Sequence, residues 1–255
     1  MRPGTVLVVN AGSTSLKLHL VDERGDSAPV DSIEAVEPEG VEAVAHRVVH
    51  GGPSFRQPVL IDASVRERIF ALEPLAPLHN APALRAIERA ETALPDVPHV
   101  AVFDTGFHET MPAEAAVYPV PARWRDEWGI HRYGFHGLSV AWSARRAPEL
   151  LDRGDRELRL VVCHLGGGCS VSGVRDGRSV DTTMGFSPLE GVPMATRSGS
   201  VDPGALTYLL REHELSVAEL EEALNLESGL RGLAGGAGDM AELVEAAERG
   251  DADSE

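Results

Sequence analysis

Cysteine and lysine are both scarce in this chain of 255 residues. The two cysteines, Cys163 and Cys169, are too few to build a disulfide scaffold, and their scarcity favours a reducing compartment. Lys17 is the only lysine among 23 basic residues. No apolar run approaches membrane-spanning length, and the apolar stretch TVLVVN is too short for a signal-peptide core. We therefore expect a cytoplasmic globular protein without a membrane partner.

Positive charge is also in deficit. The 23 basic residues face 40 acidic ones, which gives a formal net charge of −17. No run rich in lysine or arginine stands out, so a nucleic-acid or anionic-membrane surface is not expected. A phosphate ligand requires a local site that overcomes the global negative field. The length suffices for one large domain or two modest ones.

Several familiar catalytic motifs are absent. The single lysine follows Leu16, so no Walker A sequence is present, and neither a dinucleotide-binding G-x-G-x-x-G after a strand nor a G-x-S-x-G elbow occurs. His46 and His50 are four residues apart in the β-branched stretch HRVVH. On a strand this spacing separates them by about 13 Å, which is too far for a shared zinc ion.

Two stretches of the chain share one pattern. TVLVVNAGSTSLKLHLVD and LRLVVCHLGGGCSVSGVRDG each predict a strand, a turn of small residues and a second strand, with Gly12 and Gly166 in equivalent places. The repeat indicates two related lobes. Glycine turns of this kind either close a plain hairpin or present backbone N–H groups to an anion such as phosphate, and the pattern leaves both interpretations open.

The remaining chain alternates strands and helices, which predicts an α/β class with mixed sheets. Strands are expected in AVAHRVVHGG and in HVAVFDTGFH, where the strand ends at Asp104. Helices are expected in NAPALRAIERAETAL, with a possible cap at Asn80, and in HGLSVAWSARRAPELL. Ser216 with Glu219 forms a capping-box pattern, and Asp239 is a candidate cap for MAELVEAAER.

Polar residues stand where expected strands run into glycine turns, which is where open α/β folds bind ligands. They are Asn10, Arg47, Asp104 and His136, and Arg197 lies in the loop MATRSGSVDP. Each has a structural alternative, because buried polar groups often satisfy turn backbones. Together they fit phosphoryl transfer, which needs positioning and charge neutralisation more than covalent chemistry. Arginines bind carboxylate and phosphate in bidentate fashion.

Longer motifs carry a specific resemblance. The segments are VLVVNAGSTSLKL, HRVVHGG, LAPLHN, VAVFDTGFHETMP, YGFHG, HLGGGCS and DTTMGFSPLEGVPMATRSGSVDP. In this order they resemble the acetate kinases of the acetokinase family, within the acetate and sugar kinase, Hsp70 and actin superfamily. The resemblance implies a duplicated two-lobe actin-like ATPase (ribonuclease H-like) fold with an incomplete second lobe. The lobes would be 1–108, carrying the first phosphate hairpin and the acyl-substrate side, and 109–255, a partial nucleotide-binding lobe.

The implied activity is reversible transfer of the ATP γ-phosphate to acetate with Mg²⁺, in a homodimer. The implied catalytic residues are Arg47, Asp104, His136 and Arg197. The implied acyl-binding residues are Val49, Leu78, His79, Phe135 and Pro188. The implied nucleotide- and phosphate-binding residues are Asn10, Ser13, Ser15, Lys17, His164, Gly166, Gly167, Gly168 and Asp239, with Asn10 also near the metal.

The chain also departs from the family pattern. Gly167 replaces an asparagine of the phosphate loop, and Ala241 replaces an arginine that follows Asp239. Members of the family continue past the position that matches Glu255. Three readings therefore stay open: an acetate kinase, a kinase of propionate or butyrate, and a truncated non-catalytic remnant that binds nucleotide or phosphate.

Overall fold

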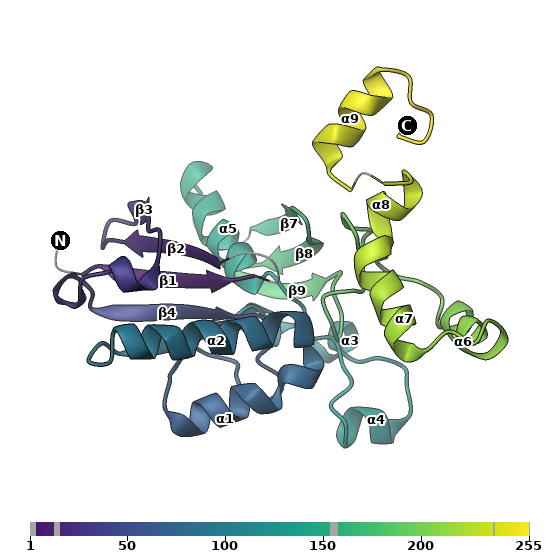
Figure 1. Cartoon of the computed structure of the whole chain (residues 1–255). Helices are drawn as coiled ribbons and strands as arrows, with labels where there is room; N and C mark the ends of the chain where they lie inside the picture. The colour runs from purple at the N-terminus through teal and green to yellow at the C-terminus, as the bar shows by residue number, and fades with distance from the viewer. Residues whose placement is uncertain (1–3, 13–15, 154–157, 237, 255) are drawn as a thin grey trace. The chain divides into compact units, whose positions relative to one another are not determined.

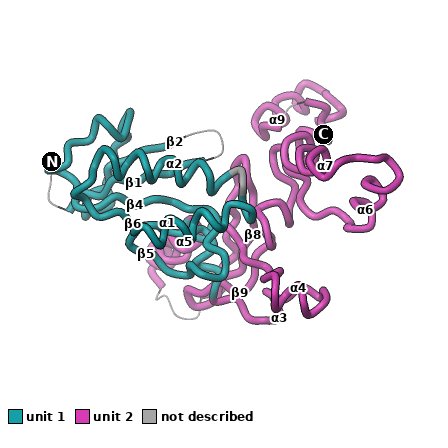
Figure 2. Tube along the Cα trace, turned by 60° about the horizontal axis from the view of Figure 1, so that its bottom comes forward, with its two compact units in different colours: residues 1–109, 136–138 teal, residues 110–135, 139–255 magenta. Residues whose placement is uncertain are grey.

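The computed structural model describes residues 4–12, 16–153, 158–236 and 238–254. The chain divides into two compact units, which Figure 2 distinguishes by colour. The N-terminal unit comprises residues 1–109 and 136–138, and the C-terminal unit comprises residues 110–135 and 139–255. The assignment of separate ligands to two lobes stays a prediction.

The N-terminal unit is built on a six-stranded mixed sheet in the order β3-β2-β1-β4-β6-β5. Its centre is parallel, because β1 pairs with β4 and β4 with β6 in the same direction, while β2, β3 and β5 are antiparallel additions. The strands are β1 (Val6–Ala11), β2 (Leu16–Val21), β3 (Ser27–Pro29), β4 (Ala43–Val48), β5 (Val59–Leu60) and β6 (His99–Phe103).

Helix α2 (Pro77–Ala93) contacts β1 and β4, and α1 (Ala63–Ala71) packs against α2 (Figure 1). Short 3₁₀ turns connect these elements at η1 (Ile33–Ala35), η2 (Pro38–Gly40), η3 (Glu73–Leu75) and η4 (Gly106–Thr110). Alternate residues of β1 and β4 are buried, as a sheet covered on one face requires. The core includes Leu7, Val44, Ile69 and Ile87, all with no exposed surface.

The C-terminal unit contains a three-stranded antiparallel sheet of β7 (Arg159–Leu165), β8 (Cys169–Arg175) and β9 (Arg178–Thr182). Its helices are α3 (Ala113–Ala116), α4 (Ala122–Asp126), α5 (Gly137–Leu150), α6 (Pro203–Glu212), α7 (Val217–Glu222), α8 (Gly229–Leu233) and α9 (Met240–Glu248), with a π-helical segment η5 (Ala223–Glu227) after α7. The first two residues of α5 belong to the N-terminal unit.

Most local predictions are confirmed. Both glycine-turn segments are antiparallel hairpins, and the class is α/β with a mixed sheet. Ser216 and Glu219 form the reciprocal capping box, and the Asp239 carboxylate caps α9 by accepting from the backbone N–H of Ala241 at 2.8 Å. Within the described residues, no helix is long and apolar enough to span a bilayer.

The predicted cap at Asn80 is wrong. Helix α2 begins three residues earlier at Pro77, because proline fits the first helical turn, where its missing N–H costs nothing. Asn80 is instead fully buried inside the helix. Its carboxamide accepts from the backbone N–H of His50 and donates to the His50 carbonyl, both at 3.2 Å.

Candidate functional site

Three of the predicted site residues meet at the carboxyl ends of the parallel strands. Asn10 is near the end of β1, Arg47 near the end of β4, and Asp104 directly follows β6. Arg47 Nη1 donates to Asn10 Oδ1 at 3.0 Å, and Arg47 Nε lies 3.1 and 3.0 Å from the two carboxylate oxygens of Asp104. This edge of an α/β sheet is where such folds bind ligands.

The Arg47–Asp104 pair is shielded from water on the carboxylate side. The Asp104 side chain is 2% exposed, whereas that of Arg47 is 25% exposed. Burial disfavours the charged guanidinium, but the Asp104 carboxylate outweighs it and raises the pKa of Arg47 above its ordinary value. Arg47 therefore stays cationic and is held rigidly, while part of its side chain remains open to a ligand.

A backbone hydrogen bond of the next residue, Gly137, holds His136 close to this cluster. Gly137, the first residue of α5, donates its N–H to the Asp104 carbonyl at 2.8 Å. A Cβ on Gly137 would overlap that same carbonyl oxygen, so only glycine allows the approach. His136 itself has a positive φ of 59°, an uncommon conformation for a residue with a side chain. Such strain is concentrated at functional sites.

Other predicted residues of the N-terminal unit differ in exposure. Lys17 is exposed and lies directly opposite Asn10 in the β1–β2 register, so both side chains emerge on one face of the sheet. Val49 is 3% exposed, and His79 is half-buried in the first turn of α2. Ser13 and Ser15 lie outside the described residues, as does the side chain of Leu78.

The second glycine turn connects β7 to β8 in the C-terminal unit. Among the described parts of the chain, a Cβ on Gly167 would meet nothing within 4 Å, and one on Gly166 would meet only the Gly168 carbonyl at 3.6 Å and His164 at 4.0 Å. Neither glycine has a positive φ, so turn geometry does not demand glycine here. The open space above the turn favours the interpretation that a ligand approaches the backbone. His164 Nδ1 lies 3.0 Å from Ser139 Oγ.

Arg197 is held in its loop by main-chain contacts. Its Nη1 donates to the Pro188 carbonyl at 3.1 Å. The carbonyls of Met194 and Thr196 accept from the N–H groups of Leu230 and Ser228, where α8 begins. Burial lowers the pKa of Arg197 from its ordinary value, and nearby Cys169 offsets only part of this effect. A partly desolvated guanidinium binds an anion more strongly than an exposed one.

The sequence did not single out one charged cluster, which lies in and beside the segments that contain Phe135 and Pro188. It consists of Arg132, Glu190 and Tyr118, in which Arg132 Nη2 lies 3.0 Å from Glu190 Oε1 and the Tyr118 hydroxyl donates to Glu190 Oε2. Arg132 directly precedes the YGFHG motif, and Glu190 lies inside the motif DTTMGFSPLEGVPMATRSGSVDP. Glu190 lies inside a family motif and Arg132 beside one, and Tyr118 lies in none of the motifs, so the sequence carried little signal for this cluster.

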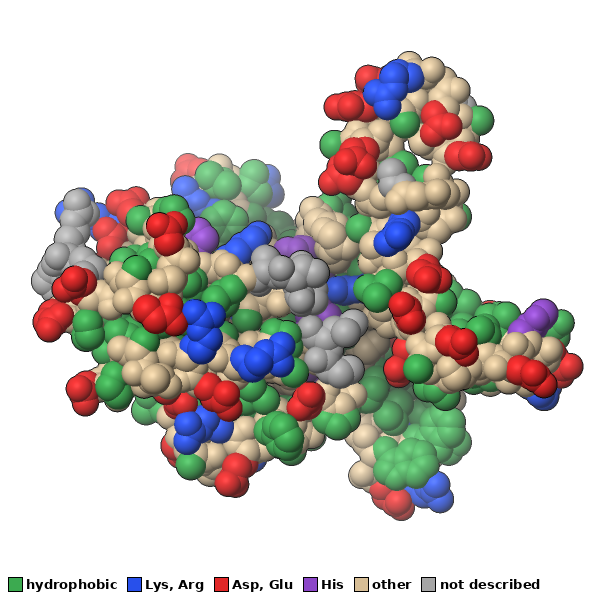
Figure 3. Space-filling model, in the orientation of Figure 1, with side chains coloured by type: hydrophobic (Ala, Val, Ile, Leu, Met, Phe, Trp, Pro, Cys, Tyr) green, Lys and Arg blue, Asp and Glu red, His purple; other side chains and the backbone are tan. Residues whose placement is uncertain are grey.

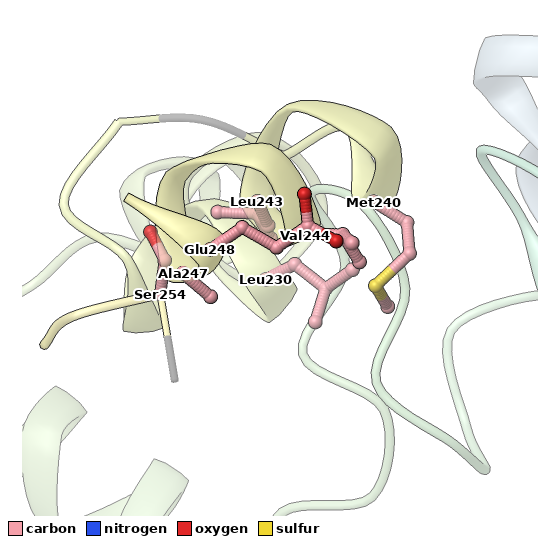
Figure 4. A pocket seen from close by; sticks show the side chains of 7 residues that line it. All are labelled: Leu230, Met240, Leu243, Val244, Ala247, Glu248 and Ser254. Carbon is pink, nitrogen blue, oxygen red and sulfur yellow. The ribbon is translucent and has the colours of Figure 1, made fainter. Parts of the chain in front are cut away.

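Asp239 lies at the start of α9 and is exposed. The same helix lines an open pocket of about 540 Å³, shown in Figure 4. The lining residues are Leu230, Met240, Leu243, Val244, Ala247, Glu248 and Ser254. Because this lining includes a carboxylate and no basic side chain, the pocket itself lacks the charge that a phosphate needs.

On the face shown in Figure 3, lysine and arginine are interspersed with acidic side chains.

The donor set for a metal ion is small. Among the described residues, no group of three His, Cys, Asp or Glu side chains is placed to hold one. Asn10 and Asp104 are the oxygen donors at the strand ends, and both already accept from Arg47. Magnesium usually keeps several waters and takes one or two protein carboxylates together with substrate phosphates. The oxygens of Asn10 and Asp104 therefore fit a Mg²⁺ ion that is carried by substrate phosphates.

Comparisons with known proteins agree on one family. The model of the acetokinase family matches residues 30–255. An acetate kinase of Synechococcus sp. is 55% identical over 212 residues, covering 83% of this chain and 52% of that protein. An acetate kinase of Deinococcus radiodurans is 54% identical over 210 residues, with 82% and 53% covered. The chain thus spans about half the length of the curated relatives it matches.

Solved structures are similar over almost the whole chain. A propionate kinase from Francisella tularensis has a TM-score of 0.91 at 35% identity, covering 98% of this chain and 75% of that one. The acetate kinase of Porphyromonas gingivalis has a TM-score of 0.84 at 32% identity with the same coverage. These neighbours have the actin-like ATPase fold, which confirms the predicted fold class. The chain belongs to the acetokinase family.

Proposed function

We propose that the protein is an acetate kinase that transfers the γ-phosphoryl group of ATP reversibly to acetate. The observation that carries this proposal is the rigid Arg47–Asp104–Asn10 cluster at the strand ends, in a chain of the acetokinase family. In the reaction a carboxylate oxygen of acetate forms a bond to the γ-phosphorus. The bond from that phosphorus to the bridging oxygen breaks, and ADP leaves with the electron pair.

Each site residue has a role in this scheme. Arg47 and Arg197 orient the carboxylate and neutralise the transferring phosphoryl group, because a guanidinium offers paired N–H donors to planar oxyanions. Asp104 holds Arg47 in place, and His136 donates to the phosphoryl oxygens as their charge is redistributed. The proposed acyl-binding residues are Val49, Leu78, His79, Phe135 and Pro188.

The nucleotide phosphates are assigned to the two glycine hairpins. Backbone N–H groups of Gly166, Gly167 and Gly168, with His164, would receive them, together with Asn10, Ser13, Ser15 and Lys17. Asp239 is assigned to the nucleotide, although its carboxylate already caps α9. When bound, Mg²⁺ supplies charge neutralisation on the phosphates, and Asn10 and Asp104 would hold its waters. The homodimer also remains part of the proposal.

Formation of acetyl phosphate, trapped with hydroxylamine, tests this function. The purified chain is given acetate and MgATP, and an Arg197→Ala variant runs in parallel to exclude a contaminating host kinase. Activity that disappears in the variant supports the kinase. Bound nucleotide without turnover in the unmodified chain would support the non-catalytic alternative instead.

Propionate is the second substrate to test, because the Francisella tularensis neighbour with a TM-score of 0.91 is a propionate kinase. One methylene in an apolar pocket changes discrimination by about 10- to 200-fold. Comparing kcat/KM for acetate, propionate and butyrate therefore separates these enzymes. A higher value for propionate or butyrate would contradict the assignment to acetate.

A further inference from the structure

Two of the proposed acyl-binding residues, Phe135 and Pro188, belong to segments that are hydrogen-bonded together inside the C-terminal unit. The N–H groups of Tyr133 and Gly134 both donate to the Gly185 carbonyl, at 3.0 and 3.2 Å. The rings of Tyr133 and Phe186 lie 6.1 Å apart. The segment that ends in Phe135 is therefore held against the segment that leads to Pro188.

Arg132 fastens the first segment to the end of β9. Its Nη1 lies within hydrogen-bond distance of three successive carbonyls, those of Thr182, Thr183 and Met184, at 3.2, 3.1 and 3.2 Å. Its Nε donates to the Ala115 carbonyl at 3.2 Å, and its Nη2 pairs with Glu190. The side chain is only 17% exposed, so these bonds are sheltered from competition by water.

Glu190 and Tyr118 fasten the second segment. The Glu190 carboxylate accepts from Arg132 with one oxygen and from the Tyr118 hydroxyl with the other. The same hydroxyl accepts from the backbone N–H of Phe186 at 2.9 Å. Burial and the hydrogen bond with Glu190 raise the pKa of Tyr118, which keeps its proton available for donation.

Gly185 shows how closely the backbone approaches this cluster. A Cβ there would overlap both the Glu190 carboxylate and the Tyr118 hydroxyl. A side chain at this position would push the Glu190 carboxylate and the Tyr118 hydroxyl out of place, so the glycine is part of the same arrangement. The network also reaches Arg197, because Arg197 donates to the carbonyl of Pro188, two residues before Glu190.

We propose that Arg132, Glu190 and Tyr118 form a positioning network that fixes Phe135 relative to Pro188 and thereby sets which short carboxylic acid the protein prefers. This inference rests on the proposed function and adds the determinant of its acyl specificity. None of the three side chains needs to touch the substrate. A rigid spacing of the two apolar residues discriminates a methyl from an ethyl group, whereas a loosened spacing admits both.

The test uses Glu190→Gln, which keeps the size of the side chain and removes its charge. Affinity for acetate is expected to fall about tenfold, and the preference for acetate over propionate is expected to shrink, because an apolar pocket discriminates one methylene by about 10- to 200-fold only while its shape is kept. Affinity for ATP is expected to stay unchanged. Tyr118→Phe, which removes both hydrogen bonds of the hydroxyl, is expected to shift the preference in the same direction and keeps the inference testable if Glu190→Gln does not fold.

Glu91→Gln is the matched control. It breaks an ion pair of the N-terminal unit, in which Arg66 Nη1 lies 2.7 Å from Glu91 Oε2. Both side chains of this pair are partly exposed. Steady-state kinetics supply KM and kcat for each acid. Binding of acetate and of propionate, followed by ligand-observed NMR, supplies the same comparison without turnover.

The outcomes are distinct. An unmodified chain that neither turns over nor binds any of these acids refutes the proposed function and the inference with it. An unmodified chain that binds acetate, with Glu190→Gln and Tyr118→Phe variants of unchanged acid preference, refutes the inference alone. Equal losses of acetate and ATP affinity, or the same shift in Glu91→Gln, would show general destabilisation and would also overturn it.

Discussion

The Nε atom of Arg47 lies 3.1 and 3.0 Å from the two carboxylate oxygens of Asp104, and Nη2 of Arg47 donates a further hydrogen bond to Oδ2. The pair joins the ends of β4 and β6, which are neighbouring parallel strands. A buried carboxylate held this way stabilises the fold only while its cation is present, and removal of either charge leaves the other without compensation.

Asp104→Asn is therefore expected to lower the free energy of unfolding by about 2 kcal/mol, since the amide keeps one acceptor but loses the charge. It is also expected to reduce acetyl phosphate formation at least 100-fold, because Arg47 loses its fixed orientation. Urea denaturation and the hydroxylamine assay measure the two effects. Glu34→Gln, which breaks the exposed Arg89–Glu34 pair, is the control. Equal losses of stability and activity in the two variants would show that the buried Arg47–Asp104 pair contributes no more than an exposed ion pair.

Asn80→Ala is expected to destabilise the N-terminal unit. The substitution removes the two hydrogen bonds between the Asn80 carboxamide and the buried main chain of His50, at a cost of about 1–3 kcal/mol. Thermal unfolding of the variant measures the loss. Asn225→Ala is the comparison, because the bond from its partly exposed side chain to the Glu221 carbonyl, one turn away, is open to water. A larger loss of melting temperature in Asn225→Ala than in Asn80→Ala would show that the link between α2 and the loop after β4 does not stabilise the N-terminal unit.

Gly137→Ala and Gly167→Ala are expected to differ sharply. The first places a methyl group on the Asp104 carbonyl, and overpacking of this kind costs about 1–3 kcal/mol. The second meets open space at a φ that is not positive, so the melting temperature should not fall. Differential scanning calorimetry compares the two. A loss of stability in Gly167→Ala would mean that the turn itself requires glycine, contrary to the ligand-approach interpretation.

The buried pair of His46 and His99 makes stability depend on pH. A carbonyl only accepts, so His99 Nε2 donates to Leu94 at 3.1 Å, and its Nδ1 must accept from His46 Nε2 at 3.0 Å. Among the residues that the structure describes, His46 Nδ1 is then a buried acceptor without a hydrogen-bond partner. Burial, and secondarily His99, lowers the pKa of His46 to about 3.

Because the unfolded chain binds this proton near pH 6.5 and the folded chain does not, stability falls as pH drops from about 6.5 towards 3. By this linkage the free energy of unfolding should be about 2 kcal/mol lower at pH 5 than at pH 7.5. Urea denaturation at the two pH values tests the expectation. His46→Gln removes the titration and should flatten the dependence between pH 7.5 and 5. An unchanged slope in that variant would assign the effect to other groups.

Local pattern was sufficient for most of the secondary structure. Apolar and β-branched runs next to turns of small residues predicted β1, β4 and both glycine hairpins. The Ser216–Glu219 and Asp239 caps followed from residues three or fewer positions apart. Such features depend on hydrogen bonds between near neighbours, which residue type and spacing already specify. Long motifs carried the family assignment for the same reason, because they are contiguous in sequence.

Tertiary structure alone decided the rest. Asparagine is a residue type that favours helix N-caps, yet Asn80 bonds to His50, 30 residues away. Arg132 and Glu190 are 58 residues apart, and His46 and His99 are 53 apart. Whether such polar groups meet depends on strand order and on which face each side chain leaves, and no local pattern encodes either. Their partners are fixed only when burial removes water as the alternative partner.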